Sequence, residues 1–177
     1  MAMRIPITFF APAKREPIEV VRRQAGRLGQ TPLAQTLLNA AFNYLFVLNN
    51  RRQIVMASEN VLELFPGKTM GQIIGLRPGE ALGCIHAYEC ESGCGTSLFC
   101  RHCGAVRVIL AGLAGHRHMQ ECHLTCLTDG REASLELRVL ATPLVQDEER
   151  YTLLAVEKVI HEKREAMQPQ VDTERLR

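Results

Sequence analysis

Residues 43–57 read NYLFVLNNRRQIVMA, and this stretch decides the fold that the sequence predicts. Its first half, residues 43–49, is rich in the aromatic and branched apolar residues that favour β-strands. The polar segment Asn49-Asn50-Arg51 follows, and residues 52–57 are again mostly apolar. Two apolar runs joined by so short a polar segment predict a β-hairpin and therefore an antiparallel sheet.

Three more strands are predicted in the C-terminal half. They cover residues 116–127, 131–145 and 150–160. The Asp129-Gly130 pair between the first two of them is a strong hairpin signal. Every second residue from Leu135 to Ala141 is apolar, which gives this strand one buried face. The sequence therefore predicts a five-stranded antiparallel sheet.

Helical segments are predicted around the first hairpin and before the last three strands. They cover residues 31–41, 58–65, 69–75 and 105–114. In the first of them Thr31 is the expected N-cap. Its expected buried face consists of Leu33, Leu37, Leu38 and Ala41. Strands and helices in this order predict an α+β domain with the helices on one face of the sheet.

The segments outside residues 31–160 have their own character. Residues 1–16 are interpreted as a flexible arm, because prolines interrupt their short apolar patch. Residues 17–30 predict an amphipathic helix. Its narrow apolar stripe consists of Ile18, Val21, Ala25 and Leu28. We expect this stripe to pack on its own domain, with a homodimer contact through residues 17–30 as the alternative. Residues 161–177 are predicted to be a charged tail with a short helix.

Residues 75–110 form a cysteine-rich insert that holds five of the seven cysteines. Thiolates that converge on one centre are typical metal ligands, and glycines free the backbone beside several of these residues. The predicted ligands are Cys84, Cys94, Cys100 and Cys103. His86 is an alternative ligand or a hydrogen-bond partner of one, and Cys90 is a weaker alternative because no glycine flanks it.

The spacing leaves the metal open between zinc and a [4Fe-4S] cluster. Zinc would make the insert a structural knot in an interaction module, whereas a cluster would make it a sensor. A third alternative is a thiol–disulfide protein that uses Cys100 and Cys103. We expect no catalytic residues and no enzyme, because the parallel-strand context of a thiol oxidoreductase is missing from the predicted elements.

The segments around the hairpin are similar to those of a PAS domain. They are Leu37-Leu38-Asn39-Ala40-Ala41-Phe42, Tyr44 to Asn49, Ile54 to Asn60 and Met70-Gly71-Gln72-Ile73-Ile74-Gly75. The insert, with C-x-H-A at 84–87, G-C-G-T-S at 93–97 and C-x-x-C-G-A at 100–105, resembles a cysteine-rich PAS subgroup of bacterial signalling proteins. The resemblance covers residues 31–160. It implies a sensor of redox state, a gas or a small molecule, whose insert lies beside the ligand cavity.

Other candidate residues have simpler interpretations. Cys122 and Cys126 share one strand face with Leu124 and are interpreted as small buried hydrophobic residues rather than ligands. His116 and His118 are expected to be solvated. Arg77 and Glu80 could form an ion pair that fixes the loop, or stay solvated. The basic residues of the N-terminal region are expected to be solvated. They are Arg15, Arg22, Arg23 and Arg27.

Composition limits the partners and the compartment. The net charge of +2 is too small for a dedicated nucleic-acid-binding protein, so nucleic acid is not an expected partner. No apolar run is long enough to cross a membrane, and the N-terminus does not match an export signal. We therefore expect a cytoplasmic protein. The resemblance to PAS domains, with no output module recognised after residue 160, implies signalling in trans to a partner such as a kinase or a regulator.

Overall fold

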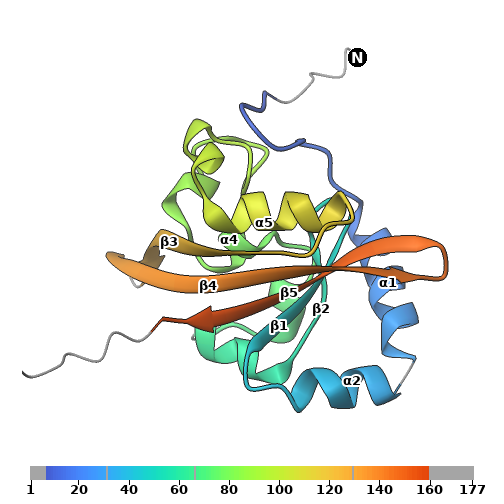
Figure 1. Ribbon diagram of the computed structural model, residues 1–177. Coiled ribbons are helices and arrows are strands. Elements are labelled where there is room, and N and C mark those ends of the chain that lie inside the picture. The colour runs from blue at the N-terminus through green and yellow to red at the C-terminus, as the bar shows by residue number, and fades with distance from the viewer. Residues whose placement is uncertain (1–6, 31, 66, 129, 160–177) are drawn as a thin grey trace, which may run out of the picture.

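The computed structural model describes residues 7–30, 32–65, 67–128 and 130–159, and its centre is one five-stranded antiparallel sheet (Figure 1). The strand order is β2-β1-β5-β4-β3. The strands are β1 (Tyr44–Asn49), β2 (Ile54–Ala57), β3 (His118–Thr128), β4 (Arg131–Gln146) and β5 (Glu149–Lys158). The predicted α+β class and its five-stranded antiparallel sheet are confirmed.

The β1–β2 hairpin is held by the buried side chain of Asn49. Its amide oxygen accepts hydrogen bonds from the backbone N–H groups of Arg51 at 2.9 Å and Gln53 at 3.0 Å. An asparagine that bonds to the backbone two residues ahead stabilises a turn. Arg52 completes the turn with φ of +67°, in the left-handed region that glycine and asparagine occupy most readily. The turn thus brings β2 back beside β1.

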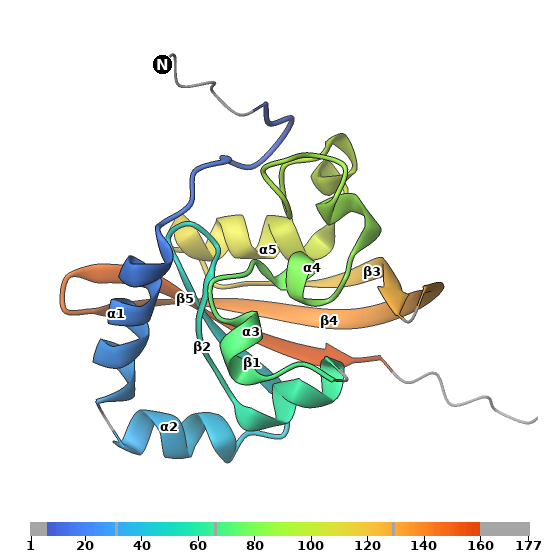
Figure 2. The same cartoon turned by 180° about the vertical axis from the view of Figure 1, so that it is seen from behind.

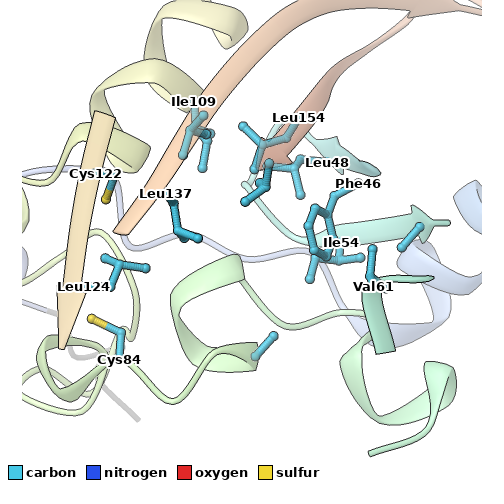
Figure 3. Packing of buried hydrophobic residues seen from close by; sticks show 14 of the residues in the cluster. Phe46, Leu48, Ile54, Val61, Cys84, Ile109, Cys122, Leu124, Leu137 and Leu154 are labelled. Atoms are coloured by element: carbon cyan, nitrogen blue, oxygen red, sulfur yellow. The ribbon is translucent and has the colours of Figure 1, made fainter. Parts of the chain in front are cut away.

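Most helices cover the inner face of the sheet, as predicted. They are α3 (Met70–Ile73), α4 (Pro78–Ala81), α5 (Gly104–Leu113) and three short 3₁₀ helices at Glu59–Leu64, Ile85–Ala87 and Leu98–Arg101. The main core lies between them and the sheet, where Ile109 of α5 packs with Leu137 and Leu154 (Figure 3). Burying large aliphatic side chains in this way contributes about 2 kcal/mol each.

The opposite face of the sheet is covered by α1 (Ile18–Gly29), which lies away from α5 in Figure 1. Val21 and Leu28 are buried against Val47 of β1 and Val55 of β2. Val21 and Leu28 of the predicted apolar stripe therefore pack on the chain's own sheet, as expected. Ile18, at the N-terminal end of that stripe, is 39% exposed.

Three polar contacts also hold α1 in place. Gln24 is buried and donates to Glu149 at 2.9 Å, while it accepts from Asn49 at 3.1 Å. Arg27 forms an ion pair with Glu149. These contacts link α1 to the β1–β2 turn and to the start of β5.

Helix α2 (Pro32–Asn39) differs from its prediction. Leu38 is buried in the cluster beneath α1, but Leu33 and Leu37 are exposed. The expected face of four buried residues is wrong, because this short helix lies at the edge of the fold and turns only one side toward it. The expected N-cap Thr31, Asp129 of the predicted hairpin turn and the predicted tail helix within residues 161–177 lie outside the described residues. None of the helices in the described ranges has the length and apolar character that a bilayer crossing requires.

Candidate functional site

A cavity of about 220 Å³ lies between the inner face of the sheet and the cysteine-rich insert. The sheet contributes apolar side chains to its wall. They include Phe46, Leu124, Leu137, Val139, Leu154 and Val156. Helix α5 contributes Val106 and Ile109 from the other side. The wall is therefore mostly apolar, and its chemistry comes from the insert.

All four predicted ligands line this cavity. Cys84 follows α4, Cys94 lies in the next loop, Cys100 lies in the 3₁₀ helix Leu98–Arg101, and Cys103 is the N-cap of α5. Cys84 and Cys100 are buried, whereas Cys94 and Cys103 are partly buried. The fold thus gathers residues that are up to 19 positions apart in the insert around one space.

Gly79 in α4 allows Cys94 to pack closely against this helix. A β-carbon at residue 79 would lie 2.7 Å from the sulfur of Cys94 and 3.5 Å from the β-carbon of Cys84. The first distance is shorter than van der Waals contact, so only glycine leaves room for the Cys94 side chain there. Gly93 and Gly95 on either side of Cys94 have positive φ angles, which glycine adopts at little cost.

The N-terminal arm closes the site from outside. Residues 1–16 were expected to be flexible, but the described part lies along the insert (Figure 2). The N–H groups of Phe9 and Ala11 donate to the carbonyls of Thr96 and Gly95, both at 2.9 Å. Ala11 is only 1% exposed and packs in a small cluster with Cys100. The arm is thus part of the shell around the cysteines.

Arg77 joins the arm, the hairpin turn and the insert. Its side chain is fully buried and donates to backbone carbonyls in all three segments. The acceptors are Ala13 at 3.1 Å, Lys14 at 2.9 Å, Arg51 at 3.1 Å, Ser92 at 2.8 Å and Cys94 at 3.2 Å. Burial, reinforced by the nearby charges of Arg52 and Arg15, lowers the pKa of Arg77 to about 9. Arg77 therefore stays charged at neutral pH.

Glu80 has a different partner from the one predicted. Its carboxylate pairs with the Arg15 guanidinium of the arm and accepts from the backbone N–H groups of Cys94 at 2.9 Å and Arg77 at 3.0 Å. The expected side-chain pair of Arg77 and Glu80 is replaced by these contacts. A residue distant in the sequence had to supply the cation, so the local Arg-Pro-Gly-Glu pattern could not reveal it.

The thiols of the site differ in acidity. Cys103 and Cys122 lie with their sulfurs 3.7 Å apart. This contact, together with the backbone N–H groups of Val106 and Ala105 at the start of α5, lowers the pKa of Cys103. The pKa of Cys122 is raised by the same contact and by burial. Helix N-termini stabilise thiolates in this way.

Burial favours the neutral form of three other thiols. Burial raises the pKa of Cys84, and it raises the pKa of Cys94 to about 12. Cys126, which is paired with Cys84 in an isolated β-bridge, has a pKa raised to about 11 by burial. We therefore expect Cys103 to ionise more readily than Cys84, Cys94 and Cys126.

The lowered pKa of Cys103 gives a prediction for alkylation. In metal-free protein, the rate at which iodoacetamide alkylates Cys103 should reach half of its maximum at a pH below about 8.5, which is the pKa of an ordinary cysteine thiol. A depressed pKa means that the reactive thiolate persists as the pH falls, until the pH passes below that pKa. Peptide mass spectrometry over a pH series measures the rate. In Cys122→Ala, which lacks the hydrogen bond, the half-maximal pH should move upward; an unchanged pH profile would contradict the assigned cause.

The alternative ligands lie in different places. His86 lines the cavity, its Nδ1 atom lies 2.7 Å from Glu89, and its ring stacks on Phe99 with centroids 4.6 Å apart. Cys90 lines a separate surface depression beside Tyr88 and Glu91. Within the described ranges, no three cysteine, histidine or acidic side chains are close enough together to hold a single metal ion. The cysteines surround the cavity rather than meet at a point.

Sequence reasoning missed the place of Cys122 in the site. Cys122 and Cys126 are buried on the same strand face as Leu124, as their spacing predicts, and Figure 3 shows Cys122 and Leu124 on β3. Cys122 also contacts Cys103. The residue spacing carried no signal for this contact, because it depends on how α5 packs on β3. His102 and His123 also line the cavity. His116 and His118 are exposed.

Comparisons with known proteins concern the fold. No family model matches the sequence, and no curated protein matches it. Among solved structures, the Rhodobacter sphaeroides LOV protein has a TM-score of 0.51 and 14% sequence identity, over 73% of this chain and 67% of that one. The PAS domain of a protein from Colwellia psychrerythraea has a TM-score of 0.50 and 12% identity, over 73% of this chain and 98% of that one. The chain has the fold of PAS domains, as the resemblance of its sequence predicted.

Proposed function

We propose that this protein is a sensor in signal transduction whose cavity holds a metal centre bound by Cys84, Cys94, Cys100 and Cys103. The observation that carries the proposal is that these four cysteines line one cavity of about 220 Å³ inside a PAS fold. A cavity of this kind between a sheet and its covering helices suits a small ligand or cofactor.

The chemistry of the wall fits a soft metal centre. Thiolate is the preferred ligand of zinc and of iron–sulfur clusters. Burial disfavours an isolated thiolate, so the raised pKa values of Cys84 and Cys94 mean that these thiols need a cation beside them to ionise. A metal centre would supply that charge when bound, and its binding would release protons.

The arm gives the site a route to a partner. Ala11 packs beside Cys100, and the arm continues into α1 on the opposite face of the sheet. A change of redox state or of a bound gas or small molecule at the centre would alter the insert against which the arm packs. Helix α1 would pass this change to a signalling protein in trans, such as a kinase or a regulator.

A thiol–disulfide function is the second candidate, and one contact favours it. The sulfurs of Cys103 and Cys122 lie 3.7 Å apart, so the reactive pair would be these two rather than Cys100 and Cys103. Two thiols and one molecule of a peroxide would give one disulfide, with the peroxide reduced. Mass mapping of disulfides in metal-free protein treated with hydrogen peroxide tests for this pair.

Metal content tests the leading proposal. The full chain, purified without oxygen, should contain bound metal, and Cys103→Ala should lose most of it because a cavity ligand is missing. Cys90→Ala is the matched control and should keep its metal, because Cys90 lies outside the cavity. Elemental analysis of both variants measures the effect. Equal losses from the two variants would refute the ligand set.

A further inference from the structure

We infer that the centre is an anionic iron–sulfur cluster rather than a single zinc ion, and that Arg52 is the positioning residue that compensates its charge. This inference rests on the proposed function, because it names the cofactor class of the same site. Three features of the molecule carry it: the spread of the thiols around the cavity, the buried positive charge beside them, and the backbone of Arg52.

The spread of the thiols selects a polynuclear centre. A single zinc ion needs four donors at about 2.3 Å, which places tetrahedral sulfur ligands only about 3.8 Å from one another. Cys103 and Cys122 are at such a distance, but no third donor in the described ranges completes a group around one ion. The four cysteines instead line a space of about 220 Å³. A cluster, whose thiolates bind at separate iron atoms, suits ligands arranged around a volume.

The buried positive charge beside the insert favours an anion nearby, although the carbonyls that accept from Arg77 offset part of it. Arg52 and Arg77 are 3% and 0% exposed, and Arg15 reaches in from the arm. Glu80 is the carboxylate that faces this group, and it is paired with Arg15. Three cations and one anion leave two positive charges in a largely buried place, which is costly unless an anion lies nearby. A [4Fe-4S] core with two positive charges and four thiolates carries two negative charges in total. A zinc tetrathiolate carries the same charge, so it is the spacing of the thiols that selects the cluster.

The backbone conformation of Arg52 does not favour an arginine at this position. Its φ of +67° lies where glycine or asparagine is favoured, so the turn itself gains nothing from arginine. One guanidinium nitrogen donates to the carbonyl of Pro12 at 2.8 Å. The buried Nε has no hydrogen-bond partner within the described part of the chain.

That unpartnered N–H lies next to the insert. A β-carbon at residue 95 would be 3.3 Å from Nε of Arg52, and Gly95 follows Cys94 directly. Arg52 is also within electrostatic range of the sulfurs of Cys94 and Cys100. A donor and a fixed positive charge at this place stabilise thiolate ligands and the reduced, more negative state of a cluster.

The first experiment identifies the centre in the full chain purified without oxygen. Elemental analysis should give about four iron and four acid-labile sulfide per chain, with a broad visible absorption band that disappears on reduction. One zinc without sulfide, lost in Cys103→Ala, would overturn the cluster and leave the proposed metal-binding sensor standing. If the parent protein contains no metal, or if its metal content is the same in Cys103→Ala, both the cluster and the proposed metal-binding sensor are overturned.

The second experiment tests Arg52 with three variants. Arg52→Asn removes the charge but suits the left-handed turn, so the fold should be retained, as circular dichroism during thermal unfolding will show. It should lose its cluster to a chelator about tenfold faster than the parent, and its midpoint potential should become more negative. Arg52→Lys keeps the charge and should show smaller changes of both quantities.

Arg51→Gln is the matched control, because the neighbouring Arg51 forms an ion pair with Glu16 and neither residue lines the cavity. It should match the parent in chelator kinetics and in potential. If Arg52→Asn also matches the parent in both readouts, the role of Arg52 is overturned, whatever the metal proves to be.

Discussion

Replacing Arg77 by methionine is expected to lower the free energy of unfolding by at least about 4 kcal/mol. The variant keeps much of the side-chain volume but removes the donors for carbonyls in the arm, the turn and the insert. A buried carbonyl without a partner costs about 1–3 kcal/mol. Urea unfolding followed by circular dichroism measures the change through its midpoint, with an unchanged slope as the check on two-state behaviour.

Two further variants sharpen this result. Arg77→Lys can satisfy some of the carbonyls, so its stability should lie between those of the parent and Arg77→Met. Arg101→Gln removes an exposed guanidinium that bonds only to the carbonyl of Phe9 among the described contacts, and it should change the stability by less than about 1 kcal/mol. Comparable losses for Arg77→Met and Arg101→Gln would show that Arg77 does not hold the three segments together.

Replacing Gly104 by alanine is the second change with a large expected effect. A β-carbon at residue 104 would lie 2.2 Å from the carbonyl oxygen of Glu121 in β3, and backbone cannot move aside as a side chain can. The start of α5 must therefore shift away from β3, which moves Cys103 from Cys122. We expect a loss of about 3 kcal/mol, at the upper end of overpacking effects, together with slower alkylation of Cys103 at neutral pH.

Gly26→Ala is the matched control for this prediction. Gly26 lies in α1 with nothing within 4 Å of the added carbon. Alanine should raise the stability there by about 1 kcal/mol, because glycine is unfavourable inside a helix. Thermal and urea unfolding of the two variants should thus change in opposite directions. A stable Gly104→Ala protein with the parent's alkylation profile would mean that α5 does not need this close contact.

Local patterns were sufficient for the sheet. The apolar run from Tyr44, the turn at Asn49 and the alternation from Leu135 to Ala141 each describe interactions within a few residues or across one hairpin. The same reasoning named the four cysteines that line the cavity, because glycines and short spacings already suggested a common centre. It also placed Cys122 and Cys126 on one buried face of a strand.

Local patterns failed where partners come from distant segments. The arm looked flexible because prolines interrupt its short apolar patch. It is held by partners from distant segments, among them the carbonyls of Gly95 and Thr96 and the buried Arg77. The buried face of α2 was overestimated because helical periodicity does not tell how much of a helix its neighbours cover.

The amino-acid sequence by itself determined the five strands, the hairpins among them and the cluster of cysteines in the insert, since these depend on side-chain pattern and on neighbours in the chain. Tertiary structure alone decided that the arm closes over the insert, that Glu80 pairs with Arg15, and that Cys103 meets Cys122. Each of these contacts joins residues whose distance is set by the packing of separate elements, and no local pattern records that distance.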